Sequence, residues 1–240
     1  MRRRGARIVL VAMLAVLCAS CRLELDVLAD IEHDGAGSLS VRLSADRELL
    51  SAAAAAGADP LGDLVTTGRR LSDEGWRTTE ETAQDGRRTV TLSSRFADAA
   101  AFEALSRDLA AALSADEVDL LEPLRLELDD DEIRLRGSAG LEPTRAVRDY
   151  GLSRRQATRL LRRSEAFGYT VSVRLPGEVL STSASVSDPA LTWPVEPGER
   201  VAIRAVGERP WPPLLRVLTG GLAGGLAAIG FLAARRLRRR

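Results

Sequence analysis

Residues 23–43 read LELDVLADIEHDGAGSLSVRL, and this stretch decides the fold class. On both sides of a turn at residues 33–37, apolar side chains alternate with charged or polar ones; they are Leu23, Leu25, Val27, Leu39, Val41 and Leu43. A period of two residues is typical of strands with one buried face. The stretch therefore predicts a β-hairpin.

The same pattern recurs along the chain with helical segments between the hairpins. Helices are predicted from residue 44 or 46 to 56, over 61–71 and over 98–113, and an Arg-rich helical region over 144–167. Hairpins are predicted over 76–96, around Asp85-Gly86, and over 124–135, and short strands over 169–175, 179–186, 191–193 and 200–206. Asp-Gly between alternating segments is a strong hairpin signal. These elements predict an α+β fold: antiparallel hairpins and a meander, with helices packed on one face.

Charge and cysteine content exclude several classes of protein. The 34 basic and 34 acidic side chains balance, which argues against nucleic acid as a partner. Every basic residue is Arg. The two cysteines, Cys18 and Cys21, lie close together near the N-terminus, so residues 22–240 contain no disulfide and no thiolate metal site.

The first residues resemble an export signal. Residues 1–20 combine an arginine-rich start, a short apolar run and small residues before Cys21, and the apolar run is shorter than the ~20 residues of a spanning helix. We expect a signal peptide over 1–20 and lipidation of Cys21, as in a bacterial lipobox. Cys18 stands where that motif usually has Leu. The alternative is ordinary cleavage near the same point, which leaves a free thiol.

The other end resembles a membrane anchor. We expect a transmembrane helix within residues 210–234, with Trp211 at the interface, and a basic cytoplasmic tail over 235–240. Residues 21–209 then form one extracytoplasmic domain at the cell membrane. Two overlapping GxxxG patterns allow close helix contact with a second copy or a membrane partner; they comprise Gly220, Gly221, Gly224 and Gly225. The alternative is that these glycines only reflect the alanine- and glycine-rich composition of the segment and mediate no helix contact.

No motif in the sequence indicates catalysis, a cofactor or a metal. His33 is the single histidine and lies in a predicted turn, without the nucleophile and orienting group that a general base needs. Residues 129–132 read DDDE; they lack the ligand spacing of an EF-hand and are interpreted as a solvated hairpin tip rather than a calcium site. We therefore expect a protein that is not an enzyme, with no cofactor and no metal.

The candidate ligand residues are Arg155, Arg159 and Arg162, which share one face of the predicted Arg-rich helix. Guanidinium groups bind phosphate in a bidentate manner, so an anionic lipid headgroup is a natural ligand. Two alternatives remain: contact of this face with the outer leaflet, or ion pairs with the acidic residues 116–119 or 129–132.

The layout resembles the LppM-type lipoproteins of mycobacteria and other actinobacteria. The residues that carry the resemblance are CRLELDV at 21–27, the turn at His33-Asp34-Gly35, VSVRLPGEV at 171–179 and LTWPVEPGE at 191–199, followed by the C-terminal apolar segment and basic tail. The resemblance implies a lipidated, membrane-tethered, exported domain with an α+β fold that binds lipid or glycolipid. It implies no catalytic residues.

Three functions follow, in order of preference. The first is a tethered extracytoplasmic domain that binds lipid or glycolipid without catalysis. A concave sheet packed against helices is a suitable scaffold for an apolar ligand. The second is a structural or interaction protein of an envelope membrane complex. The third, an enzyme, has the least support.

Overall fold

The computed structural model describes residues 21–114, 120–141, 155–156, 158–159, 162, 166–187 and 190–209. The predicted signal peptide, transmembrane helix and basic tail lie outside these residues. Within the described part of the chain, no helix has the length and apolar character needed to cross a bilayer.

Seven strands form the larger of two sheets. Their order is β3-β4-β2-β1-β7-β10-β9. Their bounds are β1 (Leu23–Ile31), β2 (Gly37–Ala45), β3 (Arg77–Thr82), β4 (Arg88–Phe96), β7 (Phe167–Arg174), β9 (Ser185–Ser187) and β10 (Ala190–Pro194). The predicted hairpins β1–β2 and β3–β4 are confirmed, because both pairs are antiparallel and in continuous register.

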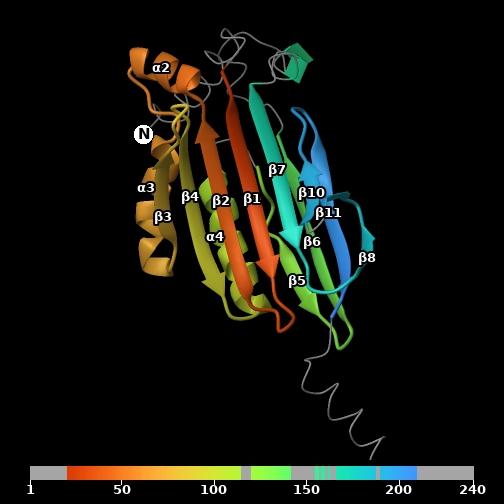
Figure 1. The fold of residues 1–240 in the computed structure, drawn as a ribbon. Coiled ribbons are helices and arrows are strands. Elements are labelled where there is room, and N and C mark those ends of the chain that lie inside the picture. The colour runs from red at the N-terminus through yellow and green to blue at the C-terminus, as the bar shows by residue number, and fades with distance from the viewer. Residues whose placement is uncertain are drawn as a thin grey trace, which may run out of the picture.

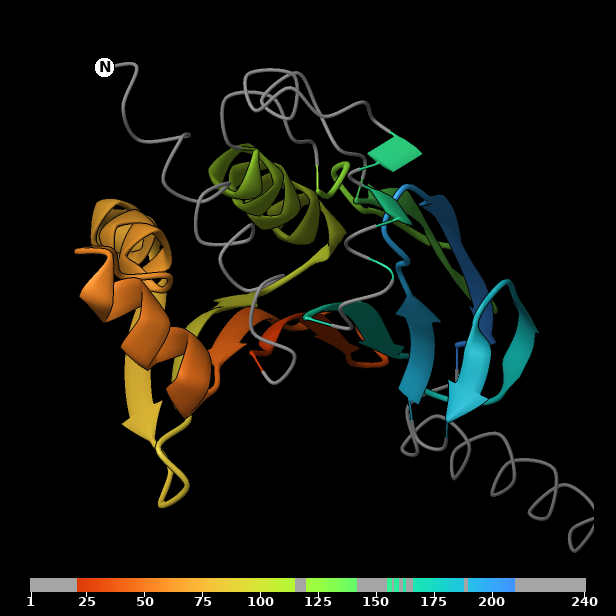
Figure 2. The ribbon, with the colours of Figure 1, turned by 90° about the horizontal axis from the view of Figure 1, so that it is seen from above.

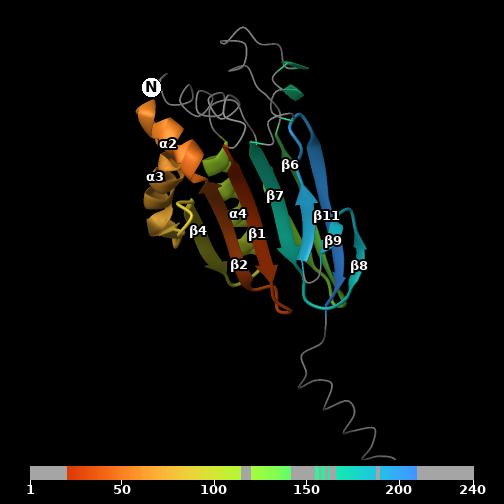
Figure 3. The same ribbon diagram turned by 45° about the horizontal axis from the view of Figure 1, so that its top comes forward.

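Four strands form the smaller sheet, in the order β5-β6-β11-β8. Their bounds are β5 (Arg125–Leu128), β6 (Glu132–Gly140), β8 (Val179–Thr182) and β11 (Arg200–Glu208). The chain passes from the larger sheet to the smaller one after β7 and returns to it at β9, so β8 and β9 lie at the junction of the two sheets (Figures 1 and 3).

The helices are α2 (Arg47–Ala55), α3 (Gly62–Leu71), the 3-10 helix η1 (Ser72–Glu74) and α4 (Ala99–Leu113). Asp46 caps α2 by accepting from Leu49 N, and Asp98 caps α4 by accepting from Ala101 N. Such caps satisfy amides that have no partner within the helix. The predicted helices at 46–56, 61–71 and 98–113 are thus confirmed to within a residue or two.

The helices α3 and α4 pack on the face of the larger sheet that carries its apolar side chains (Figure 2). Gly68 of α3 allows a close approach, since a Cβ there would lie 2.5 Å from Leu92 Cδ2. On α4, Phe102 is fully buried and its ring meets Phe96 edge-on at 5.0 Å between centroids. The expectation of helices on one sheet face is met for α3 and α4.

The sheet itself differs from the predicted one in two respects. β1 and β7 pair in parallel, Leu23 opposite Phe167, and the strands divide between two sheets rather than forming one antiparallel meander. Parallel neighbours require a long crossover, and here residues 32–166 provide it. The fold is therefore α+β with two sheets, and one central pair of strands in the larger sheet is parallel.

The two ends of the domain lie at opposite ends of the strands. β1 begins beside Cys21, and α2 lies at that end (Figures 1 and 3). β11 ends at Glu208, and the next residue, Arg209, donates from Nε to the carbonyl of His33 in the turn after β1, 3.1 Å away. Nine strand residues span roughly 30 Å. Cys21 and Arg209 are separated by about that length.

Candidate ligand-binding surface

Arg162 is held against the turn between β10 and β11. Its Nε donates to the carbonyl of Pro197 at 2.9 Å, and its Nη2 lies 2.5 Å from Glu199 Oε1 and 3.7 Å from Glu196 Oε2. The predicted ion pair of the Arg-rich helix thus exists, but with different carboxylates from those expected. These contacts fix Arg162 to the β10–β11 turn.

Arg155 and Arg159 are both exposed and both have helical backbone. Arg159 Nε donates to the carbonyl of Arg155 over 3.4 Å, and neither guanidinium contacts a carboxylate within the described residues. The acidic residues 129–132 do not pair with them, and residues 116–119 lie outside the described range. Of the three predicted ligand residues, Arg155 and Arg159 are the ones that form no ion pair with a residue that the structure describes.

Cys21 lies at the same end of the molecule as this segment. Leu23 N donates to the carbonyl of Ala166 at 2.8 Å, and β1 and β7 begin side by side. The turn that holds Arg162 is also close, since Val195 N donates to Tyr169 O. The Cys21 side chain is 3% exposed. The predicted lipidation site and the predicted headgroup site therefore share one end of the domain.

Tyr169 closes the core at this end. Its ring is 2% exposed and its hydroxyl donates to the carbonyl of Leu120 at 2.9 Å. Desolvation raises the pKa of the hydroxyl well above its usual value, so the group stays protonated and acts as a structural donor.

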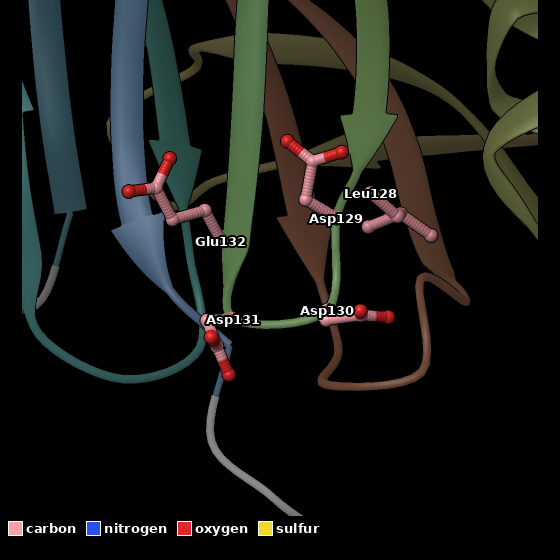
Figure 4. A pocket seen from close by; sticks show the side chains of 5 residues that line it. All are labelled: Leu128, Asp129, Asp130, Asp131 and Glu132. Carbon is pink, nitrogen blue, oxygen red and sulfur yellow. The ribbon is translucent and has the colours of Figure 1, made fainter.

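The acidic turn between β5 and β6 lies at the opposite end. Leu128 and residues 129–132 line a hollow of about 480 Å³, and their carboxylates point in different directions (Figure 4). Arg134 binds Asp129 and Glu132. In the described part of the chain, no three His, Cys, Asp or Glu side chains converge to hold a metal ion. The acidic turn is engaged in its own ion pairs.

Arg209, at the C-terminal end of the domain, contacts this acidic turn. Its N–H donates to Asp131 O at 2.8 Å and its Nη1 to Asp129 O at 3.0 Å. The carbonyl of His33 is its third acceptor, and the His33 side chain is exposed in its turn. These contacts fix the point where the chain leaves the domain. The expectation that His33 is not catalytic stays a prediction.

Among the carboxylates that the structure describes, Asp26 is the one with a clearly shifted pKa, and it lies on the face of the larger sheet that no described helix covers. It faces Arg42 on β2 and Thr170 on β7. Desolvation raises its pKa, Glu24 raises it further, and Arg42 opposes both. A carboxyl with a raised pKa is more stable protonated, so its charge costs stability at neutral pH.

Asp26→Asn is expected to raise the melting temperature at pH 7. The pKa of Asp26 is higher in the folded state than in the unfolded state. The charged carboxylate therefore destabilises the fold to its full extent at pH values above the folded-state pKa. This destabilisation disappears below about pH 4, where the carboxyl is protonated in both states. Thermal scans between pH 3.5 and 7.5 measure the difference. Asp30→Asn, on the same strand and face, is the control and should give no gain. A gain that persists at low pH would contradict this reading of Asp26.

Comparison with known families decides the classification. The LppM domain family matches residues 25–209, which is nearly all of the domain. The chain belongs to the LppM domain family. The family matches no further than Arg209, the residue at which the described part of the chain also ends.

Two further comparisons were made for this LppM domain, one with curated proteins and one with solved structures. No curated protein matches it in sequence. Among solved structures, the NMR structure of the folded domain of Mycobacterium tuberculosis LppM matches with 16% identity and a TM-score of 0.49, covering 80% of this chain and 92% of that one. The family match over residues 25–209 confirms the resemblance that was read from the sequence.

The structure of this LppM domain also reveals a basic cluster that the sequence did not show. Arg125, Arg136 and Arg204 lie directly opposite one another on β5, β6 and β11. The spacing of these three arginines along the sequence does not indicate that they lie together. Only the alternation of charged and apolar residues within each strand hints that all three point away from the core.

Proposed function

We propose that this LppM-family protein is a membrane-tethered extracytoplasmic domain that binds lipid or glycolipid and is not an enzyme. The observation that carries the proposal is the pair Arg155 and Arg159, exposed and without a carboxylate partner in the described residues, at the end where Cys21 begins the domain. Two adjacent guanidinium groups suit a phosphate headgroup. Arg162, which binds Glu199, positions them.

The tether consists of two parts in this proposal. A diacylglyceryl group on Cys21 supplies the first, and a transmembrane helix within 210–234 the second. One acyl chain binds a membrane weakly, so the second anchor is needed for stable attachment. Because Cys21 is 3% exposed, an acyl group on its sulfur requires that this residue turn out of the core. The bulk of the chain then lies outside the cell membrane and residues 235–240 inside it.

An interaction role within an envelope complex is the second candidate. It depends on the glycines Gly220, Gly221, Gly224 and Gly225, which lie outside the described residues, and it stays a prediction from the sequence.

The double substitution Arg155→Gln and Arg159→Gln is expected to weaken lipid binding by at least about 100-fold, because each of the two lost charge-assisted hydrogen bonds contributes about 1.5–3 kcal/mol. Native mass spectrometry of the full-length protein, released from membranes in mild detergent, measures the co-purifying lipid. Arg107→Gln, an exposed arginine of α4, is the matched control. Wild-type protein without bound lipid, or equal occupancy in both variants, would contradict the proposal.

A further inference from the structure

The outer face of the smaller sheet carries a transverse row of three arginines. Arg136 of β6 is directly opposite Arg125 of β5 on one side and Arg204 of β11 on the other. All three are exposed. Residues one step away in the same register, Leu126, Leu135 and Ala205, are buried, so the arginines point away from the core. Cross-strand neighbours have Cβ atoms about 4.5–5.5 Å apart, which places three cationic side chains within reach of one anion.

The three arginines of the row form fewer and longer ion pairs than the neighbouring arginines Arg134 and Arg200. Arg134 binds Asp129 and Glu132, and Arg200 binds Glu122 at 2.7 Å. In the row itself, the one ion pair within the described residues joins Arg136 Nη1 to Glu127 Oε1 at 3.9 Å. Like charges that face one another across strands destabilise a sheet. The row therefore costs the free domain stability, and an anion would relieve that cost.

The surroundings of the row favour a membrane as the source of the anion. α4 packs beside β5 on the inner side of the smaller sheet, and no described helix covers the outer side (Figure 2). The neighbouring edge strand β8 carries Leu180, which is 54% exposed and is the one exposed large apolar side chain among the described residues. β11, which carries Arg204, leads directly to Arg209 and the predicted membrane segment.

The opposite positions of the chain ends favour a domain that lies along the bilayer, which allows this surface to face the headgroups. An upright domain, held at Arg209, would lift Cys21 by roughly 30 Å, the length of β1. A domain that lies with its strands along the bilayer keeps both ends near the headgroups. We propose that the outer face of the smaller sheet, with Arg125, Arg136 and Arg204 at its centre, docks onto the phosphate headgroups of the anionic bilayer that holds the protein.

This inference rests on the proposed tether, and one experiment separates the two. Full-length protein, with Cys18 and Cys21 replaced by serine, is placed in nanodiscs of phosphatidylglycerol or of phosphatidylcholine that contain brominated lipid. A fluorescent probe is attached at Ala202→Cys, between Arg200 and Arg204 on the docking face. A second sample carries it at Thr79→Cys, an exposed position on the open face of the larger sheet. Gel filtration reports whether the protein enters the discs.

The expected result is at least threefold stronger quenching at Ala202→Cys than at Thr79→Cys in phosphatidylglycerol. Replacing all three arginines by glutamine should remove the difference, as should phosphatidylcholine. The melting temperature of the triple variant should stay equal or rise, because like charges are removed. Two results would overturn the docking face and leave the tether standing. One is equal quenching at both probe positions in protein that has entered the discs. The other is a triple variant that loses the difference in quenching and also melts at a lower temperature. Protein that elutes apart from the discs would overturn the tether as well.

Discussion

Trp193→Ala is expected to lower the unfolding free energy by about 3–5 kcal/mol, the range for removing a fully buried large aromatic side chain. Trp193 is 1% exposed and lies near the end of β10. Its indole N–H donates to Ser183 Oγ at 3.0 Å, and that hydroxyl donates to Ala202 O of β11 at 2.9 Å. The side chain thus connects the larger sheet to the smaller one, and its loss leaves a cavity and removes the hydrogen bond to Ser183.

Chemical denaturation of the full-length protein in detergent measures this loss, with tryptophan-independent circular dichroism as the signal. Trp193→Phe is the matched control. It keeps most of the buried ring but loses the indole donor, so the expected cost is about 1–2 kcal/mol. If the alanine variant lost no more stability than the phenylalanine variant, the packing of Trp193 would not join the sheets.

Gly37→Ala is expected to destabilise the domain by at least about 3 kcal/mol, because overpacking against fixed atoms forces the backbone to move. A Cβ at this position would lie 2.0 Å from the carbonyl oxygen of Asp30 and 2.7 Å from Phe96 Cζ. The oxygen belongs to β1, the strand that pairs with β2 at Gly37. It cannot move without opening the central hairpin.

Gly168→Ala is the control for Gly37. Gly168 lies on β7 of the same sheet, and a Cβ there would meet its nearest atom, Glu24 Cγ, at an ordinary 3.6 Å. Its cost should stay below about 1 kcal/mol. Melting temperatures of the two variants and of the wild type test the comparison. Equal melting temperatures for the two alanine variants would contradict the contact described at Gly37.

Local patterns predicted the elements of this fold well. The alternation on both sides of residues 33–37 gave β1 and β2, and Asp85-Gly86 lies in the turn between β3 and β4. Asp46 and Asp98 cap the helices that begin after them. Each of these signals depends on residues within a few positions of one another, where backbone sterics and hydrogen bonding act directly.

The pairing of distant strands was not predictable in the same way. The parallel pairing of β1 with β7, and that of β11 with β6 rather than β10, depend on contacts between residues at least 60 positions apart in the sequence. The row of Arg125, Arg136 and Arg204 exists only in that register. The partners of Arg162 were missed for the same reason, since Glu196 and Glu199 reach it through the β10–β11 turn.

The tether and its orientation are the centre of this account, and protease access tests them most directly. Protease is added to intact spheroplasts that express the full-length protein, and the domain and its C-terminal end are followed by antibodies against each. The account predicts digestion of residues 21–209 from outside, while a fragment containing the C-terminal tail stays protected until the membrane is lysed. A domain that resists protease in intact spheroplasts and is digested in lysed ones would contradict it.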